Sequence, residues 1–269
     1  MFGYSINFRC NSVLDFFSGI DAGIKLRPTA EDLKELGPAF EARWKTYFEH
    51  APDRPVIWIG PVSAYLGDPT GVPARKYYSV GYYTQYPVSR GSVHISSADN
   101  ANAAPDFDSG FLSDPINLNS AADLATLKWG YKKSREFARR MAVYRGEHLP
   151  GNPTFASGSV ALCQDDAKPV DIAAPDIVYT AADDAAIEAY NRAFVQTGWH
   201  SLGTCAMKPK TSAGVVDARL NVYGVQGLKV ADISIAPGNV GANTYSTALV
   251  IGEKAAVLIA EELGISGFT

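Results

Sequence analysis

Apolar residues recur at helical spacing in the first two of three segments that predict helices. Over residues 28–49 they follow a Pro-Thr start signal, which predicts a helix with one buried face. That face comprises Leu33, Leu36, Phe40, Trp44 and Phe48. Residues 123–145 predict a long amphipathic helix whose basic run we expect to be a solvated surface. Residues 182–197 predict a third helix, with two early aspartates at the positive end of its dipole.

Runs of β-branched and aromatic residues predict strands between the first two helices. They lie at residues 54–66, 77–87 and 90–96. We expect the first strand to be broken at Pro61, because proline cannot donate to a sheet ladder. A short Pro-Val-Ser connection separates the other two, which we therefore expect to be antiparallel neighbours. Residues 98–118 are rich in Asp, Asn, Pro and Ala, and predict a loop.

The second half of the chain is less regular. Residues 146–180 are punctuated by Gly, Pro and Ala, which is typical of a functional loop, a lid or disorder. Near the end, GLKVAD (227–232) predicts a short buried strand, followed by a glycine-bearing loop and a helix over 244–264. A face of mostly small residues should pack that helix on a sheet: Ala248, Leu249, Ala255, Ala256 and Ile259. The patterns together predict a mixed α+β and α/β chain.

Composition narrows the class of protein. The chain has 269 residues, 46% of them hydrophobic and 19% charged, which is enough for a sizeable core in one or two domains. The net charge of −4 argues against nucleic acid or an anionic membrane as a partner. Three cysteines without paired spacing, Cys10, Cys163 and Cys205, indicate reduced thiols. No apolar run is long enough to span a bilayer, so we expect a soluble, intracellular protein.

Most candidate chemical groups have a plain structural interpretation. His50 and His148 adjoin Pro, Gly and charged residues, so we expect both to be exposed. His94 lies in a predicted strand and is interpreted as a sheet histidine. No His, Cys or acidic residues have metal-ligand spacing, and we predict no metal site. The nearest string to a hydrolase nucleophile elbow, residues 157–159, lacks the strand–turn–helix context.

Two residues stand apart. His200 follows Trp199 and precedes small residues, which would let a planar ligand approach the backbone. It fits a core imidazole or a catalytic base equally well. Asn243 could be the N-cap of the final helix, or it could donate to a substrate oxygen.

The segments around these two residues carry a family pattern. WHSLGTC (199–205) precedes GVVDARLNVYG (214–224), GLKVADISIAP (227–237) and NVGANTYSTALVIGEKAA (239–256). In this order and spacing they resemble the C-terminal region of the glucose–methanol–choline (GMC) oxidoreductases, nearest to the alcohol (methanol) oxidases of fungi and yeasts. The resemblance extends from about residue 19 to the end of the chain.

The resemblance implies a domain organisation. Residues 1–18 are unmatched, and residues 19–198 would form a substrate-binding domain built on an antiparallel sheet with helices. Residues 199–269 would contribute the active site, together with a strand and the last helix of an FAD-binding Rossmann-like domain. The N-terminal half of that domain carries G-x-G-x-x-G in the family, and this motif is missing from the sequence.

The resemblance also implies an activity and its residues. The activity is FAD-dependent oxidation of small primary alcohols to aldehydes, with hydride passing to the flavin and O2 yielding H2O2. His200 would be the base and Asn243 would hold the substrate oxygen, while Trp199 would wall the pocket. The flavin would be contacted by Ala231, Asp232, Asn243 and Thr244.

Further implications concern partners, location and alternatives. The partners implied are a small alcohol, O2, and either the absent FAD-domain half or further copies in a homo-oligomer. Relatives in the alcohol-oxidase branch are peroxisomal, although GISGFT at the end is no SKL-type signal. Alternatives remain open: a non-catalytic remnant or interaction module, or another GMC activity such as aryl-alcohol oxidation or hydroxynitrile cleavage.

Overall fold

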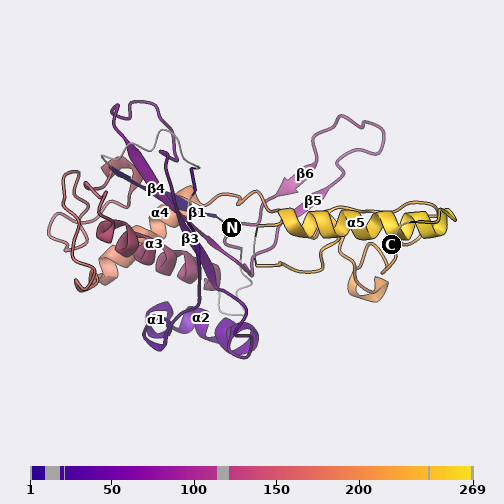
Figure 1. Cartoon of the computed structure of the whole chain (residues 1–269), viewed down its shortest axis with the longest axis horizontal. Coiled ribbons are helices and arrows are strands. Elements are labelled where there is room, and N and C mark those ends of the chain that lie inside the picture. The colour runs from indigo at the N-terminus through magenta and orange to yellow at the C-terminus, as the bar shows by residue number, and fades with distance from the viewer. Residues whose placement is uncertain (1, 10–18, 21, 114–120, 242, 268–269) are drawn as a thin grey trace. The chain divides into compact units, whose positions relative to one another are not determined.

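A computed structural model describes residues 2–9, 19–20, 22–113, 121–241 and 243–267 (Figure 1). The chain falls into two units. The first comprises Met1–Arg90 and Phe111–Gln196, and the second comprises Gly91–Gly110 and Thr197–Thr269. Helices combine with small antiparallel sheets, which confirms the mixed α+β part of the predicted fold class.

The first unit contains a four-stranded antiparallel sheet. Its strands are β1 (Phe2–Arg9), β2 (Ile24–Leu26), β3 (Ile57–Val62) and β4 (Tyr77–Thr84), in the order β1-β4-β3-β2. β4 lies between two partners and is buried along nearly its whole length. The predicted strands within 54–66 and 77–87 are therefore confirmed.

Pro61 does not break its strand, contrary to the sequence prediction. It lies inside β3, opposite Val80 of β4. The last pair between β3 and β2 joins Ile59 to Ile24, so Pro61 lies beyond the end of β2. A proline at such an edge position is compatible with a sheet, because its lack of an N–H removes no hydrogen bond to the short neighbouring strand.

The expected pairing of residues 77–87 with 90–96 is wrong. β5 (Ser92–His94) pairs instead with β6 (Asp106–Asp108), in a separate two-stranded sheet. The connecting residues are held by the carboxylate of Asp123, which accepts hydrogen bonds from the backbone N of Val88 and from the N and Oγ of Ser89. Because the connection is bound to a helix, it does not form a hairpin turn. The predicted loop 98–118 contains β6, and its residues 114–118 lie outside the described part.

The helix predicted over residues 28–49 is divided. α1 (Ala30–Leu36) is followed by α2 (Pro38–Arg43), which continues into a π-helical turn, η1 (Trp44–Phe48). Gly37 has a φ of +67° and precedes a proline, so the first helix ends there. The predicted apolar face is confirmed: Leu36, Phe40 and Phe48 are buried, and Leu33 and Trp44 pack against the same core.

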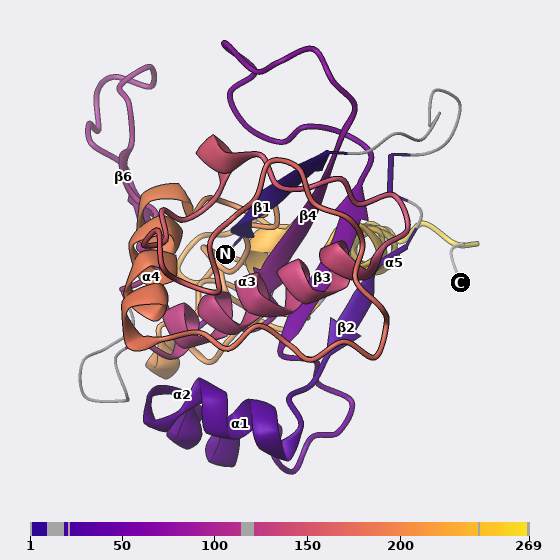
Figure 2. The same ribbon diagram turned by 90° about the vertical axis from the view of Figure 1, so that its left-hand side faces the viewer.

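Two long helices complete the first unit. α3 (Ala122–Arg140) lies across one face of the sheet, and α4 (Ala181–Phe194) packs against α3 (Figure 2). Gly130 permits the close approach of α3 to the sheet, since a Cβ there would collide with Cδ1 of Ile57 and lie 2.8 Å from Tyr82. Tyr82 also donates from its hydroxyl to Asn191 of α4 at 2.9 Å. The helices predicted over 123–145 and 182–197 are thus confirmed, each with slightly different ends.

Both α1 and α4 begin with a capping box. At α1, Thr29 and Asp32 exchange side-chain and backbone hydrogen bonds. The second carboxylate oxygen of Asp32 accepts the indole N–H of Trp129 in α3 at 3.1 Å. The same arrangement begins α4, where Asp183 also accepts a hydrogen bond from the hydroxyl of Ser159 at 2.7 Å. Each capping carboxylate therefore also joins its helix to another segment.

The basic run of α3 is not the solvated surface that the sequence predicts. Lys132 is buried and pairs with Glu35 at 2.9 Å and Asp184 at 2.7 Å. Arg135 is buried and pairs with Glu147 through two hydrogen bonds of 2.5 and 2.9 Å. The prediction fails because acidic groups from three other segments neutralise these charges inside the unit.

The segment 146–180 packs on α3 in an irregular conformation. Its one helical turn is the 3-10 turn η3 (Leu149–Gly151). Arg135 donates to the carbonyl of Ala161 at 2.7 Å, and the backbone N of Gln164 donates to Glu147. Phe155 is buried in the core of the unit. The predicted lack of regular structure is confirmed, and the segment is packed rather than disordered.

The second unit is built around α5 (Tyr245–Glu262), as predicted, together with an irregular chain over 197–241. That chain includes two short 3-10 turns, η4 (Lys210–Ser212) and η5 (Ile233–Ile235). A small cluster forms its core: Val216, Leu220, Ile235, Ala255 and Leu258. The strand predicted at GLKVAD is wrong, because Lys229 makes only an isolated bridge with Asn221 and Leu228 is exposed.

The predicted packing face of α5 is mostly exposed within this chain, so its packing on a sheet stays a prediction. Ala255 is buried, whereas Ala248, Leu249, Ala256 and Ile259 are exposed. The buried side chains of this helix are Ala255, Leu258 and Ala260. Loop residues of the same unit cover that side of the helix.

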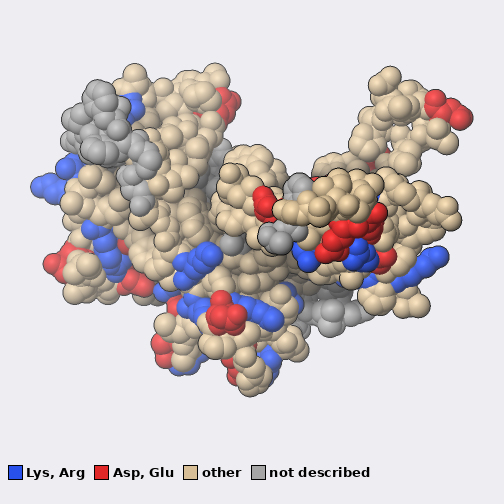
Figure 3. Space-filling view, turned by 45° about the vertical axis from the view of Figure 1, so that its right-hand side comes forward, with Lys and Arg blue, Asp and Glu red and all other residues tan. Residues whose placement is uncertain are grey.

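Charged side chains are mixed on the face shown in Figure 3. Lys and Arg alternate there with Asp and Glu and are separated by uncharged surface. Such a face lacks the one-sign patch by which a protein attracts nucleic acid. No helix in the described ranges is long and apolar enough to cross a membrane.

Candidate functional site

The second unit brings His200 and the start of α5 together. Nδ1 of His200 lies 3.1 Å from Oγ1 of Thr244 and 3.5 Å from its backbone N. Thr244 is buried and His200 is half-buried. The fold thus joins the two segments in which the sequence analysis placed its candidate residues, 44 positions apart.

Backbone contacts fix the segment that carries His200. Trp199 has a φ of +57°, and its backbone N donates to Oγ1 of Thr197 at 3.0 Å. Gly203 has a φ of +85°, and a Cβ there would lie 3.2 Å from the carbonyl oxygen of Ala236. A side chain at this position would therefore be strained. The backbone conformation therefore accounts for the glycine at position 203, three residues after His200.

The environment of His200 favours a neutral imidazole. Burial lowers the pKa of His200 below its ordinary value of 6.5. A neutral ring has one nitrogen that donates and one that accepts. The imidazole can therefore take up a proton at neutral pH, as a general base must.

Asn243 lies at the start of α5 but does not cap it. The N-cap of α5 is Thr244, so the interpretation of Asn243 as the N-cap is wrong. Asn243 is exposed and directly precedes the residue that contacts His200. Its amide is thus one residue away from a contact with the candidate base.

The other candidates lie in the same unit. Trp199 is 73% exposed. Ala231 is exposed, and the exposed Asp232 caps η5 by accepting from the backbone N of Ser234 at 2.7 Å. Hydrogen bonds from the side chain and then the backbone of Ser234 lower the pKa of Asp232. The carbonyl of Ser234 accepts from the backbone N of Cys205 at 2.9 Å. This hydrogen bond places the turn after Asp232 beside the segment that follows His200.

His148 is not exposed, contrary to the sequence prediction. It is buried between the rings of Tyr65 and Tyr77, at centroid distances of 5.4 and 5.6 Å. Burial lowers the pKa of His148 below 6.5. His50 is exposed as predicted, and His94 is exposed on β5. The neighbours of His148 in sequence gave no sign of the aromatic residues that cover it in the fold.

Thiols and metal ligands add no further chemistry to the site. Cys163 and Cys205 form no disulfide in the described part of the chain, while Cys10 lies outside it. Burial, together with the nearby Glu147, raises the pKa of Cys163 to about 12, so its thiol is protonated at neutral pH. No group of three His, Cys, Asp or Glu side chains in the described part of the chain could hold a metal ion.

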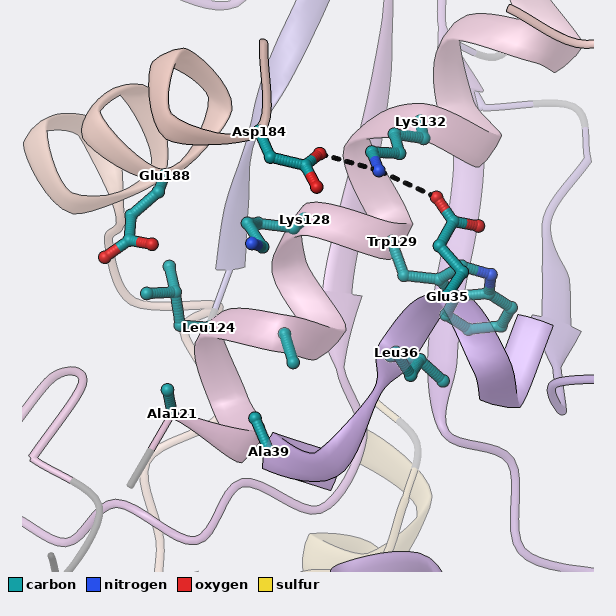
Figure 4. A pocket seen from close by; sticks show the side chains of 11 residues that line it. Glu35, Leu36, Ala39, Ala121, Leu124, Lys128, Trp129, Lys132, Asp184 and Glu188 are labelled. Atoms are coloured by element: carbon teal, nitrogen blue, oxygen red, sulfur yellow. Dashed lines mark ion pairs between the residues drawn. The ribbon is translucent and has the colours of Figure 1, made fainter. Parts of the chain in front are cut away.

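A cavity of about 100 Å³ in the first unit was not anticipated from the sequence. It lies between the helices α1, α2, α3 and α4, and Lys132 spans it with ion pairs to Asp184 and Glu35 (Figure 4). Lys128 and Glu188 also line it. Its walls come from three separate segments, so no local motif marks it, and it contains none of the predicted site residues.

Comparison with known proteins identifies the family. The GMC oxidoreductase family model matches residues 87–252. Alcohol oxidase 1 of Komagataella phaffii is 41% identical, over 93% of this chain and 43% of that protein. The alcohol oxidase of Pichia angusta is 43% identical over the same shares. The chain thus spans less than half the length of these relatives.

Solved structures agree on the fold. A formate oxidase from Aspergillus oryzae matches with a TM-score of 0.70 and 16% identity, over 97% of this chain and 46% of that one. Pyridoxine 4-oxidase from Mesorbium loti matches with a TM-score of 0.66 and 20% identity, over 97% and 42%. The family match, the sequence identity and the shared fold agree, and the chain belongs to the GMC oxidoreductases.

Proposed function

We propose that this chain is the substrate-facing part of an FAD-dependent alcohol oxidase that converts small primary alcohols to aldehydes. In this proposal residues 19–198 form the substrate-binding domain, residues 199–269 supply the active site, and residues 1–18 are unmatched. The contact between His200 and Thr244 carries the proposal, because it unites the two motif segments around a neutral imidazole.

His200 would remove the hydroxyl proton of the alcohol. Its lowered pKa keeps the ring unprotonated at pH 7, so it can accept that proton. Asn243 would donate its amide N–H to the same oxygen and stay neutral, so it would not compete for the proton. Trp199 would cover the alcohol and limit its size. FAD, when bound, would take up the two electrons and the hydrogen of the alcohol carbon, and O2 would reoxidise it with release of H2O2.

The start of α5 suits a flavin. Its N-cap residue, Thr244, makes no side-chain cap, so the positive end of the helix dipole is not covered by a capping hydroxyl. Backbone groups of Asn243 and Thr244 would face the flavin ring, where negative charge develops on reduction. Ala231 and Asp232 would approach the cofactor from the turn before η5.

The rest of the flavin site would come from polypeptide outside this sequence. The chain contains no G-x-G-x-x-G motif to hold the pyrophosphate. α5 also exposes Leu249 and Val250, apolar side chains that a partner surface could cover. We therefore propose that a Rossmann half, or a second subunit that supplies it, completes the enzyme.

The test combines flavin binding with activity. The chain would be expressed alone and together with the unmatched N-terminal part of a yeast alcohol oxidase, and retained flavin absorbance would be measured after gel filtration. Peroxide release with methanol and ethanol would then be assayed. We expect activity in the completed protein only, and a loss of roughly 10²- to 10⁴-fold in His200→Ala.

The exposed His50 provides a matched control, since His50→Ala should keep full activity. A completed protein that holds flavin but releases no peroxide would refute the alcohol-oxidase proposal. A flavin-free monomer that never associates with the added half would instead favour a separate interaction module.

A further inference from the structure

The cavity between α1, α2, α3 and α4 has no part in the proposed oxidation. Its apolar floor includes the buried side chains of Leu36, Leu124 and Trp129. Charged side chains line it as well, and those of Glu35 and Asp184 are 35% and 36% exposed, which places the charged end of the cavity at the surface. An apolar interior with a few polar groups at its mouth is the usual form of a small-molecule site.

One group of charges at the mouth carries a surplus negative charge. The ammonium of Lys132 lies 2.9 Å from Oε1 of Glu35 and 2.7 Å from Oδ1 of Asp184, so two carboxylates share one ammonium. The buried Oδ1 of Asp184 accepts no hydrogen bond in the described part of the chain, because the ammonium is close without hydrogen-bond geometry. Such an oxygen can accept from a bound molecule that carries an N–H.

Lys128 supplies a separate positive charge. It lies one helical turn before Lys132 on α3 and lines the same cavity (Figure 4). Lys128 forms no ion pair with any residue that the structure describes. Glu188, the remaining acidic residue of the lining, pairs with Arg192 at 3.0 Å. The cavity therefore offers an unpaired ammonium beside an acidic group that needs a further cation.

We propose that this cavity binds a branched aliphatic α-amino acid such as leucine. The carboxylate of the ligand pairs with the ammonium of Lys128, and its ammonium pairs with the carboxylates of Glu35 and Asp184. The side chain of the ligand fills the apolar floor. Since an apolar cavity of roughly 150 Å³ holds benzene, about 100 Å³ suits about four carbon atoms, the size of an isobutyl group.

A zwitterion fits these charges better than a ligand with a single charge. A carboxylate without an ammonium leaves the surplus negative charge around Lys132 uncompensated. An amine without a carboxylate leaves Lys128 unpaired. Because hydrogen bonds between charged groups are stronger than neutral ones, both head groups should contribute to the affinity.

Titration of the unmodified chain with three related molecules tests the site. Leucine has both head groups, 4-methylpentanoate lacks the ammonium, and 3-methylbutylamine lacks the carboxylate. Binding is followed by the NMR signal of the indole N–H of Trp129, which lines the cavity and is identified by its loss in Trp129→Phe. We expect leucine to bind saturably and at least about tenfold more tightly than either analogue. An analogue that binds as tightly as leucine, or a failure of leucine to saturate the signal, would overturn the proposal.

A variant of Lys128 tests the assigned contact. Lys128→Met keeps an unbranched side chain and removes the charge, so leucine should bind about tenfold more weakly and lose its advantage over 3-methylbutylamine. Lys34→Met is the matched control and should leave leucine binding unchanged, because Lys34 is 73% exposed and lies outside the cavity. Circular dichroism would establish that both variants are folded. Unchanged leucine affinity in a folded Lys128→Met protein would overturn the proposal, and the analogue titration remains decisive if that variant does not fold.

Discussion

Arg135→Met should destabilise the first unit strongly. The side chains of Arg135 and Glu147 are 4% and 2% exposed and share two hydrogen bonds. Without the guanidinium, the Glu147 carboxylate keeps the 3.2 Å hydrogen bond from the backbone N of Gln164, and the carbonyl of Ala161 loses its donor. Removing one partner of a buried pair typically costs about 3–5 kcal/mol. Against a usual folding stability of about 5–15 kcal/mol, this is a large fraction.

The double replacement Arg135→Met with Glu147→Leu should recover much of that loss. It removes both charges together, so no uncompensated ion stays buried. Glu31→Gln is the control, since Glu31 and Lys34 are 81% and 73% exposed and their ion pair should contribute less than about 0.5 kcal/mol.

Urea unfolding at pH 7 would measure these changes in the free energy of unfolding. A Trp199→Phe background confines the fluorescence signal to Trp44, Trp58 and Trp129, all in the first unit. A cost below about 1 kcal/mol for Arg135→Met would contradict the reasoning, because the structure leaves the carboxylate no comparable partner. A double variant as unstable as the sum of its two single changes would contradict it as well.

Three further predictions use the same unfolding assay or simple labelling. Gly130→Ala should lower the free energy of unfolding by about 1–3 kcal/mol, because the added Cβ would collide with Ile57, and this outweighs the better helix propensity of alanine. Gly252→Ala in α5 should raise it by up to about 1 kcal/mol, because its Cβ would meet open space. A larger loss for Gly252→Ala than for Gly130→Ala would contradict this packing. His148 has a lowered pKa, so the folded state binds fewer protons than the unfolded state, and stability present above pH 6.5 is lost as the pH falls. His148→Phe should flatten that decline between pH 7 and 5, and an unchanged slope would be contrary evidence. Cys163 should resist iodoacetamide at pH 8 until urea unfolds the chain, and rapid labelling of the native protein would disprove its burial.

The sequence predicted elements best where local signals agreed. The helix at α4 combines a capping threonine, early aspartates and an apolar stripe, and the structure contains it. In the region of α1 and α2 the apolar stripe also held, but it concealed the break at Gly37, because the periodicity of side chains continues across a change in the backbone.

Errors arose where the decisive partner lies far along the chain. The buried charge of Arg135 depends on Glu147 in an irregular segment that shows no periodic pattern. The burial of His148 likewise depends on two tyrosines from another part of the chain.

The candidate site likewise combines residues that the sequence indicates with a contact between distant segments that it does not. Family resemblance, rather than residue spacing, distinguished His200 from a core histidine. Its contact with Thr244 spans 44 positions and could not be read from either segment alone. The same holds for the hydroxyl of Thr244, which contacts His200 and makes no side-chain cap for α5.

The carboxylate of Asp32 has a consequence for how the first unit opens. One oxygen closes the start of α1, and the other accepts the indole proton of Trp129 in α3. If α1 separates from α3, the carboxylate loses its indole partner, and if the cap melts, the indole loses its acceptor. Amide hydrogens of α1 and α3 should therefore exchange with solvent as one cooperative block, whereas a short surface helix would otherwise fray first.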